Sequence, residues 1–268
     1  MRLFHSSILA STLILSASVL AAHEPGAQRA EFTPAPDGMS FADVMRECVK
    51  AVDPAEARLQ SGLGDARFPL ATLGPNSEQA ELFYSQGFTL QYAFNFPDAI
   101  LAFSKAISLD SGAAMPYWGI ALSAASNINS DATNGCNRLS FAASQIALAN
   151  ARVRLEDGAA RARFGIDQLE REVGYAEAFA SQYERVGEKV VVTDVTHRRY
   201  IESLKTLSER YVQDLDAAAL YANALLNVTP WQWWSGTAST GNEVKTTPEA
   251  EKALQVLDRK STRLNSSH

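Results

Sequence analysis

The chain has 268 residues and a formal net charge of −6 at pH 7, so it can bury a sizeable core in one domain or a short repeat array. Hydrophobic residues make up 46% and charged residues 20% of it, which is ordinary for a globular protein. An acidic chain without runs of Lys and Arg lacks the surface that neutralises phosphates, which argues against nucleic-acid binding.

The first 22 residues have the pattern of a secretory signal peptide. Arg2 precedes an apolar stretch from Ile8 to Leu20, and small residues come before His23. The stretch is shorter than the roughly 20 apolar residues that a membrane-spanning helix needs. We expect cleavage after Ala21 or Ala22, leaving a periplasmic or secreted protein without a membrane span.

Residues 23–76 are expected to form an N-terminal arm with one short helix. Its first part contains Pro25, Pro34 and Pro36, and residues 53–75 contain several Gly and Pro residues typical of irregular structure. A helix starting after Ser40 would place five apolar side chains on one face. These are Phe41, Val44, Met45, Cys48 and Val49.

The two cysteines, Cys48 and Cys136, remain after signal-peptide removal. An oxidising compartment would permit them to pair, and their wide separation argues against a zinc site, which needs clustered ligands. Cys48 also fits a helix core, whereas Cys136 lies in a polar loop, SDATNGCN. A disulfide and two free thiols both remain open at this point.

Apolar residues recur with the helical period from residue 77 to residue 257, with 189–193 (KVVVT) as the one stretch typical of a strand. Gly87 is followed by Ala99 twelve residues on, Phe103 four later and Ala106 three later. This is the spacing of a tetratricopeptide repeat (TPR), in which small residues let two helices approach closely and Phe103 fills the space towards the next pair. The pattern predicts helices over 77–93 and 97–109.

Further helices are predicted along the rest of the chain. A second pair covers 113–127 and 139–155. A long helix over 158–186 is followed by a helix near Tyr200 that has the spacing of the second helix of a pair. A fourth pair starts near Tyr221, and its second helix begins at Thr247. We therefore predict an all-α fold, an irregular TPR-like array of helical hairpins (an α-solenoid) over residues 77–257.

Two segments resemble a known family of bacterial TPR proteins, exported or cytosolic. They are residues 86–129, beginning QGFTLQYAFNFPDA, and residues 211–234, ending NVTPWQWW. The resemblance implies a fold more than an activity. Members often have His where this chain has Phe96 and ahead of the first repeat, where it has FPLATLGPN at 68–76, so no metal role is expected there.

The last eleven residues, 258–268 (DRKSTRLNSSH), match in order the translation of a common short-read sequencing adapter. We interpret them as an artefact and exclude them from the fold. We expect the repeat domain to be incomplete at Leu257, with more of the protein beyond it.

Reactive constellations are not evident in the sequence. His23 and His197 are isolated, and acidic pairs such as Glu170 with Glu172 lie among basic residues, as on solvated helix faces. Motifs of serine hydrolases, phosphate-binding loops and zinc proteases do not occur. We expect no catalytic residue, cofactor or metal, and a protein that is not an enzyme.

Partner binding is predicted on the concave side of the repeats. Extended peptides or helices bind such grooves. The expected residues are Glu81, Tyr84, Phe88, Gln91, Met115, Trp118 and Leu122. The alternative is that the aromatic members are core residues covered by the long helix or the arm.

A second candidate surface is the cluster of Trp231, Trp233 and Trp234, since three indoles within four residues cannot all face one side of a helix. At least one should be near the surface, for a peptide or a sugar ring, although capping the array is the simpler role. Asn127 and Asn129 could satisfy helix-terminal backbone groups or a ligand.

The sequence thus favours an exported TPR protein that acts as a scaffold or adaptor for an unknown protein or peptide. One alternative is a helical enzyme or metal-binding protein whose reactive residues lie beyond Leu257. Another is a glycan or small-ligand binding module that uses the tryptophan cluster.

Overall fold

A computed structural model of the chain describes residues 39–49, 52–129, 131–187, 189–235 and 244–266, with side chains up to residue 258. The predicted signal peptide (1–22) and the first part of the arm (23–38) lie outside the described residues. The described part is all-α, as predicted, with ten helices and two short β-hairpins.

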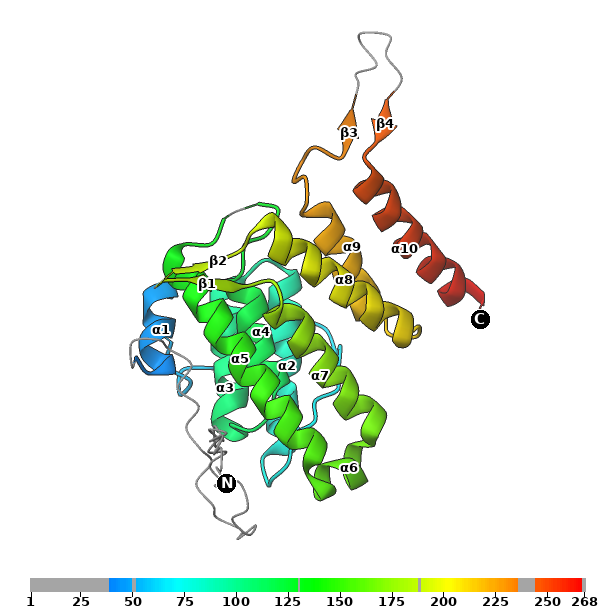
Figure 1. The fold of residues 1–268 in the computed structure, drawn as a ribbon. Helices are drawn as coiled ribbons and strands as arrows, with labels where there is room; N and C mark the ends of the chain where they lie inside the picture. The colour runs from blue at the N-terminus through cyan, green and yellow to red at the C-terminus, as the bar shows by residue number, and fades with distance from the viewer. Residues whose placement is uncertain (1–38, 50–51, 130, 188, 236–243, 267–268) are drawn as a thin grey trace, which may run out of the picture. The chain divides into compact units, whose positions relative to one another are not determined.

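Figure 1 shows the order of these elements. The helices are α1 (Phe41–Cys48), α2 (Ser77–Tyr92), α3 (Phe96–Leu109), α4 (Met115–Ala124), α5 (Asn134–Glu156), α6 (Gly158–Phe164), α7 (Ile166–Ala180), α8 (Asp194–Arg210), α9 (Leu215–Leu226) and α10 (Pro248–Ser266). The antiparallel strand pairs are β1 (Glu184–Val186) with β2 (Lys189–Val191), and β3 (Trp234–Ser235) with β4 (Lys245–Thr246).

The arm helix α1 is fixed to α5 by packing and by a covalent bond. Ser40 and Asp43 form a capping box at its first turn, so the helix starts where the sequence predicts. A disulfide joins Cys48 at the end of α1 to Cys136 in the first turn of α5. The bond ties the arm to the helical domain across 88 residues of sequence.

Helices α2, α3 and α4 pack around the ring of Phe103, which is fully buried. An added Cβ at Gly87 in α2 would lie 2.5 Å from a ring carbon of Phe103, and one at Gly119 in α4 would lie 2.6 Å from it. Only glycine at both positions lets the ring fit between the helices. α4 is shorter than predicted, because Ala125 is extended and ends the helix.

The predicted helix over 158–186 is wrong, because the chain breaks it twice. Gly165 has a φ of 79°, a left-handed conformation that separates α6 from α7. α7 then ends at Ala180, and the chain forms the β1–β2 hairpin. Periodic apolar residues continue across Gly165, so hydrophobic pattern alone does not show this boundary.

The later helices pack mainly on their neighbours in sequence. α7 contacts α5 and α8, α8 contacts α9, and α9 contacts α10 (Figure 1). α8 and α9 each begin at a side-chain cap, Thr193 and Asp214 respectively. The main hydrophobic core runs through α2–α5 and α7–α9. Within the described ranges, no helix has the length and apolar character to cross a membrane.

Candidate functional site

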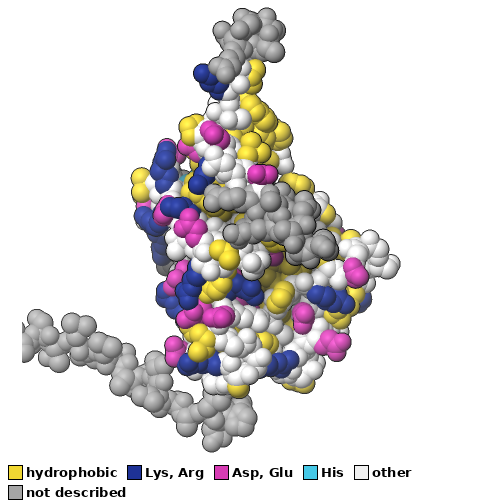
Figure 2. Space-filling model, turned by 90° about the vertical axis from the view of Figure 1, so that its right-hand side faces the viewer, with side chains coloured by type: hydrophobic (Ala, Val, Ile, Leu, Met, Phe, Trp, Pro, Cys, Tyr) yellow, Lys and Arg dark blue, Asp and Glu magenta, His cyan; other side chains and the backbone are white. Residues whose placement is uncertain are grey.

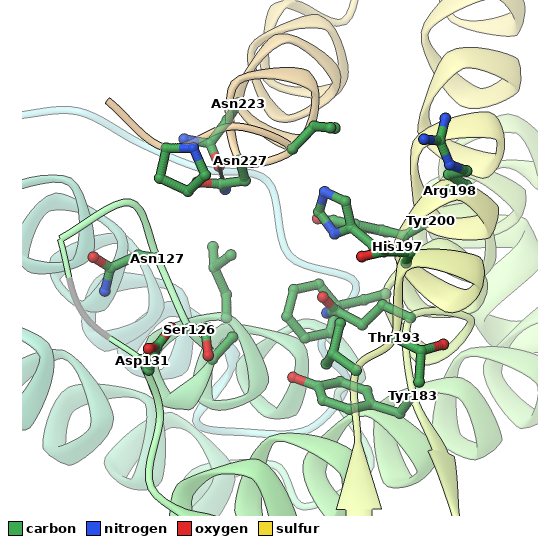
Figure 3. Close-up of a pocket in the computed structure, with 18 residues that line it drawn as sticks. Ser126, Asn127, Asp131, Tyr183, Thr193, His197, Arg198, Tyr200, Asn223 and Asn227 are labelled. Carbon is green, nitrogen blue, oxygen red and sulfur yellow. Dashed lines mark hydrogen bonds between the residues drawn. The ribbon is translucent and has the colours of Figure 1, made fainter. Parts of the chain in front are cut away.

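One cavity lies where four chain segments meet, and we call it the amide cavity. Its volume is about 470 Å³, within the range of small-ligand sites. It is built from the end of α4 and its following loop, the end of α7, the start of α8 and the end of α9. In Figure 3, Asn223 on α9 and Asn227 at its C-cap lie across the cavity from His197 and Tyr200 on α8.

Two side-chain amides that line this cavity have unused hydrogen-bonding atoms. Nε2 of Gln182 and Oδ1 of Asn227 are buried and have no hydrogen-bond partner. The other end of the Asn227 amide is engaged, because its Nδ2 donates to Oδ1 of Asn223 at 2.9 Å. Buried polar groups nearly always have partners, so these two residues bring an unused donor and an unused acceptor to the lining of one cavity.

His197 is oriented by the end of α9. Its Nε2 lies 3.0 Å from the carbonyl oxygen of Ala224. A carbonyl can only accept, so Nε2 carries the proton and donates it. Ala224 lies in the last turn of α9, where carbonyl groups lack partners within the helix. The sequence predicts a solvated His197; instead it is half-buried and lines the cavity.

The buried phenols of Tyr183 and Tyr200 form one wall of the cavity. Burial raises the pKa of both well above the ordinary value of a tyrosine. Ser140 donates to the carbonyl oxygen of Ala121 at 2.6 Å, so Tyr183 is the donor in its 2.5 Å hydrogen bond to Ser140. This wall is therefore uncharged at neutral pH and fixed in place.

The tryptophan cluster borders the same region. Nε1 of Trp231 donates to the carbonyl oxygen of Ile128 at 2.6 Å, which connects the α9–β3 segment to the loop after α4. In that loop the backbone amide of Asn129 donates to Oδ1 of Asn127, a lining residue.

The three tryptophans differ in exposure. Trp231 is 65% and Trp234 60% exposed. Trp233 is half-buried and donates to the carbonyl oxygen of Leu226, capping α9.

The exposed aromatic groove expected on the first two repeats is not open. Tyr84, Phe88, Met115 and Trp118 are all buried. The reason is that α7 packs on α4, with Tyr175 edge-on to Trp118 at a centroid distance of 5.3 Å, and the arm segment places Phe68 on Phe88 at 4.6 Å.

The remaining members of that expected set have different surroundings. Leu122 lines the amide cavity. Gln91 is half-buried and accepts a hydrogen bond from Ser123 at 2.5 Å. Glu81 is half-buried on α2 and does not line the amide cavity.

The expectation that Glu172 lies on a solvated face of a helix is wrong. Glu172 is only 4% exposed. Oε1 accepts a hydrogen bond of 2.9 Å from the amide of Ala71, 101 residues earlier in the chain. Burial raises the pKa of Glu172 to about 7, although the amide of Ala71 and the charges of Arg154 and Arg171 act in the opposite direction. Its partner in the predicted pair, Glu170, forms an ion pair with Arg210.

No group of three or more His, Cys, Asp or Glu residues within the described ranges is arranged to hold a metal ion. No protein-family model, curated protein or solved structure matches the chain.

Proposed function

We propose that this protein is an exported helical-repeat protein of TPR type, which binds an extended segment of a protein or peptide partner in the amide cavity and catalyses no reaction. The repeat assignment is supported by the Gly87, Phe103 and Gly119 packing and by helices that mainly contact their neighbours in sequence. The disulfide between Cys48 and Cys136 supports export, because disulfides persist in oxidising compartments.

The observation that carries the binding proposal is the pair of unpartnered amide atoms, Gln182 Nε2 and Asn227 Oδ1. A peptide backbone offers one donor and one acceptor per residue, which is the complement of this pair. Apolar lining residues such as Leu122, Val192 and Val228 would contact side chains of the bound segment. A volume of about 470 Å³ suits a few residues rather than a folded domain.

A glycan is the second candidate, favoured by the exposure of Trp231 and Trp234. Indole faces stack on apolar surfaces and leave an N–H for hydrogen bonding. The Trp231 N–H is already used by Ile128, so in this case the ring faces alone would contact the sugar. Figure 2 shows hydrophobic side chains on the surface below the top of the molecule. In and around β3, β4 and α10, the exposed hydrophobic residues include Trp234, Val244 and Leu254.

Panning a phage library of random linear peptides against the purified protein tests the proposal. We expect peptides enriched on the wild type to lose enrichment on Asn227→Leu, which keeps the side-chain size and removes the amide. The matched control is Asn76→Leu, at an exposed residue whose side chain makes no capping hydrogen bond. Absence of enriched peptides, or enrichment that persists on Asn227→Leu, would overturn the peptide-binding proposal. Binding of the protein to sugars on an oligosaccharide array, without peptide binding, would favour the glycan candidate.

A further inference from the structure

A second cavity, of about 100 Å³, lies between α2, α4, α7 and the start of α9, and shares no lining residue with the amide cavity. We call it the acidic cavity. Aromatic rings form much of its wall, and three carboxylates line it, from α7 and from the start of α9. The rings are those of Phe68, Tyr84, Phe88, Trp118 and Tyr175.

Two buried polar atoms of lining residues have no hydrogen-bond partner. One is Oε2 of Glu172, whose other oxygen is occupied by Ala71. The other is Nε1 of Trp118, a residue only 2% exposed. Leaving such groups without partners is unfavourable, and more so for a charged group. Two residues of the cavity lining therefore carry one acceptor and one donor that lack a hydrogen-bond partner.

The charges around the cavity favour a cation. Glu172, Asp214 and Asp216 line it together with a single basic residue, Arg171. The guanidinium of Arg171 lies 3.7 Å from Asp214. The same carboxylate accepts from the amides of Asp216 and Ala217, as the N-cap of α9. Among the lining residues, one positive charge thus faces three carboxylates, and it pairs with Asp214, which already has other partners. The charge of Arg154 also acts on Glu172, but Arg154 is paired with Asp110.

Aromatic faces beside carboxylates attract organic ammonium groups, because the negative face of each ring adds to the attraction of the carboxylate. An ammonium group cannot accept the Trp118 N–H, so a ligand that satisfies both orphan atoms also needs an oxygen acceptor. We propose that the acidic cavity binds a small organic amine that carries an oxygen acceptor, such as an amino alcohol, with Glu172 as its principal counter-charge. Asp216, in the first turn of α9, would add a second negative charge.

The proposal predicts how ligand binding depends on pH. Burial raises the pKa of Asp216, with the charge of Asp214 acting in the same direction, and the pKa of Glu172 is about 7. The groups that act on Glu172 are the Ala71 amide, the guanidinium groups of Arg154 and Arg171, the side-chain amide of Gln168 and the phenol of Tyr84. Below pH 7 Glu172 gains a proton and loses its charge, so an ammonium ligand should bind more weakly there than at pH 8.

Isothermal titration calorimetry of the full chain with ethanolamine at pH 8 tests the site, with propylamine and ethylene glycol as comparison probes. Ethanolamine carries both groups, propylamine lacks the oxygen, and ethylene glycol lacks the charge. We expect ethanolamine to bind more tightly than propylamine and ethylene glycol not to bind. The ethanolamine affinity should fall at least about tenfold in Glu172→Gln, which removes a charge-assisted hydrogen bond, and should also fall between pH 8 and pH 6.

Glu177→Gln is the matched control, because Glu177 is on the same helix and is half exposed in an ion pair with Arg152. This variant should bind ethanolamine as the wild type does. If Glu172→Gln does not fold, Asp216→Asn replaces it, with a smaller loss expected. Absence of ethanolamine binding, equal binding of ethylene glycol, or an affinity unchanged in the folded Glu172 and Asp216 variants would overturn the proposal and leave water as the occupant.

Discussion

The indole N–H of Trp231 donates to the carbonyl oxygen of Ile128, 2.6 Å away across 103 residues of sequence. This bond holds the loop after α4 against the segment after α9, the two segments on either side of the amide cavity. Trp231 has a φ of 63°, which is uncommon for a residue other than glycine. A residue in such a conformation, fixed by one long-range bond, indicates that the geometry of this rim is specified by the fold.

Trp231→Phe keeps the aromatic ring and removes the donor. We expect faster amide hydrogen exchange in residues 126–132 and a small loss of stability, about 0.5–1.5 kcal/mol, the usual net value of one hydrogen bond. Trp234→Phe is the matched control, because Trp234 is similarly exposed and lies in β3. Equal exchange in both variants would show that the Trp231 bond does not hold the loop.

Gly87→Ala should destabilise the protein by about 1–3 kcal/mol, because the new methyl group would lie 2.5 Å from the ring of Phe103 and force the two helices apart. Gly158→Ala is the comparison. A Cβ at Gly158 meets no atom within 4 Å, so this change should be neutral or slightly stabilising. Urea denaturation measures both values. Equal losses in the two variants would contradict the packing of Phe103 described above.

Replacing Cys48 and Cys136 together by Ala should lower the free energy of unfolding by about 2–5 kcal/mol, because the bond closes a loop of 88 residues in the unfolded chain. Dithiothreitol should lower the Tm of the wild type towards that of the double variant. The double variant itself should be insensitive to the reductant. A wild-type Tm that does not change after complete reduction would show that the bond adds no stability.

Glu172→Gln should change how stability depends on pH. A carboxyl whose pKa is raised by folding binds more protons in the native state, so its ionisation destabilises the wild type as pH rises from about 4.5 to about 7. The stability of the variant relative to the wild type should therefore increase by about 2–3 kcal/mol between pH 5 and pH 8. Urea melts at the two pH values measure it. The control is Glu177→Gln, whose stability relative to the wild type should be the same at both pH values. If the stability of Glu172→Gln relative to the wild type also stays the same, the pKa of Glu172 is not raised.

The sequence predicts the helical elements well where periodicity and local capping signals agree. α2 and α3 match their predicted bounds closely, because the turn between them contains Asn95 and Pro97, and α1 begins at the predicted cap Ser40. The break at Gly165 was not predicted, because a single glycine within a periodic pattern is compatible with a continuous helix.

The cavities could not be predicted, because their residues come together only through long-range contacts. Glu172 lies among charged neighbours in sequence, yet its carboxylate bonds to Ala71, 101 residues away. Gln182 and Asn227 likewise belong to separate elements and show no shared motif. Asn127 and the Trp231 region were predicted as candidates, and the structure places them beside the amide cavity, whereas Tyr84 and Trp118 are core residues.

The central proposal is that the amide cavity binds an extended peptide through Gln182 and Asn227. The most direct test is the dissociation constant of a peptide selected on the wild type, measured by titration calorimetry for wild type, Asn227→Leu and Gln182→Leu. We expect each substitution to weaken binding by about tenfold or more, because a peptide group would lose its hydrogen-bond partner on binding. Unchanged affinity in both folded variants would contradict the account.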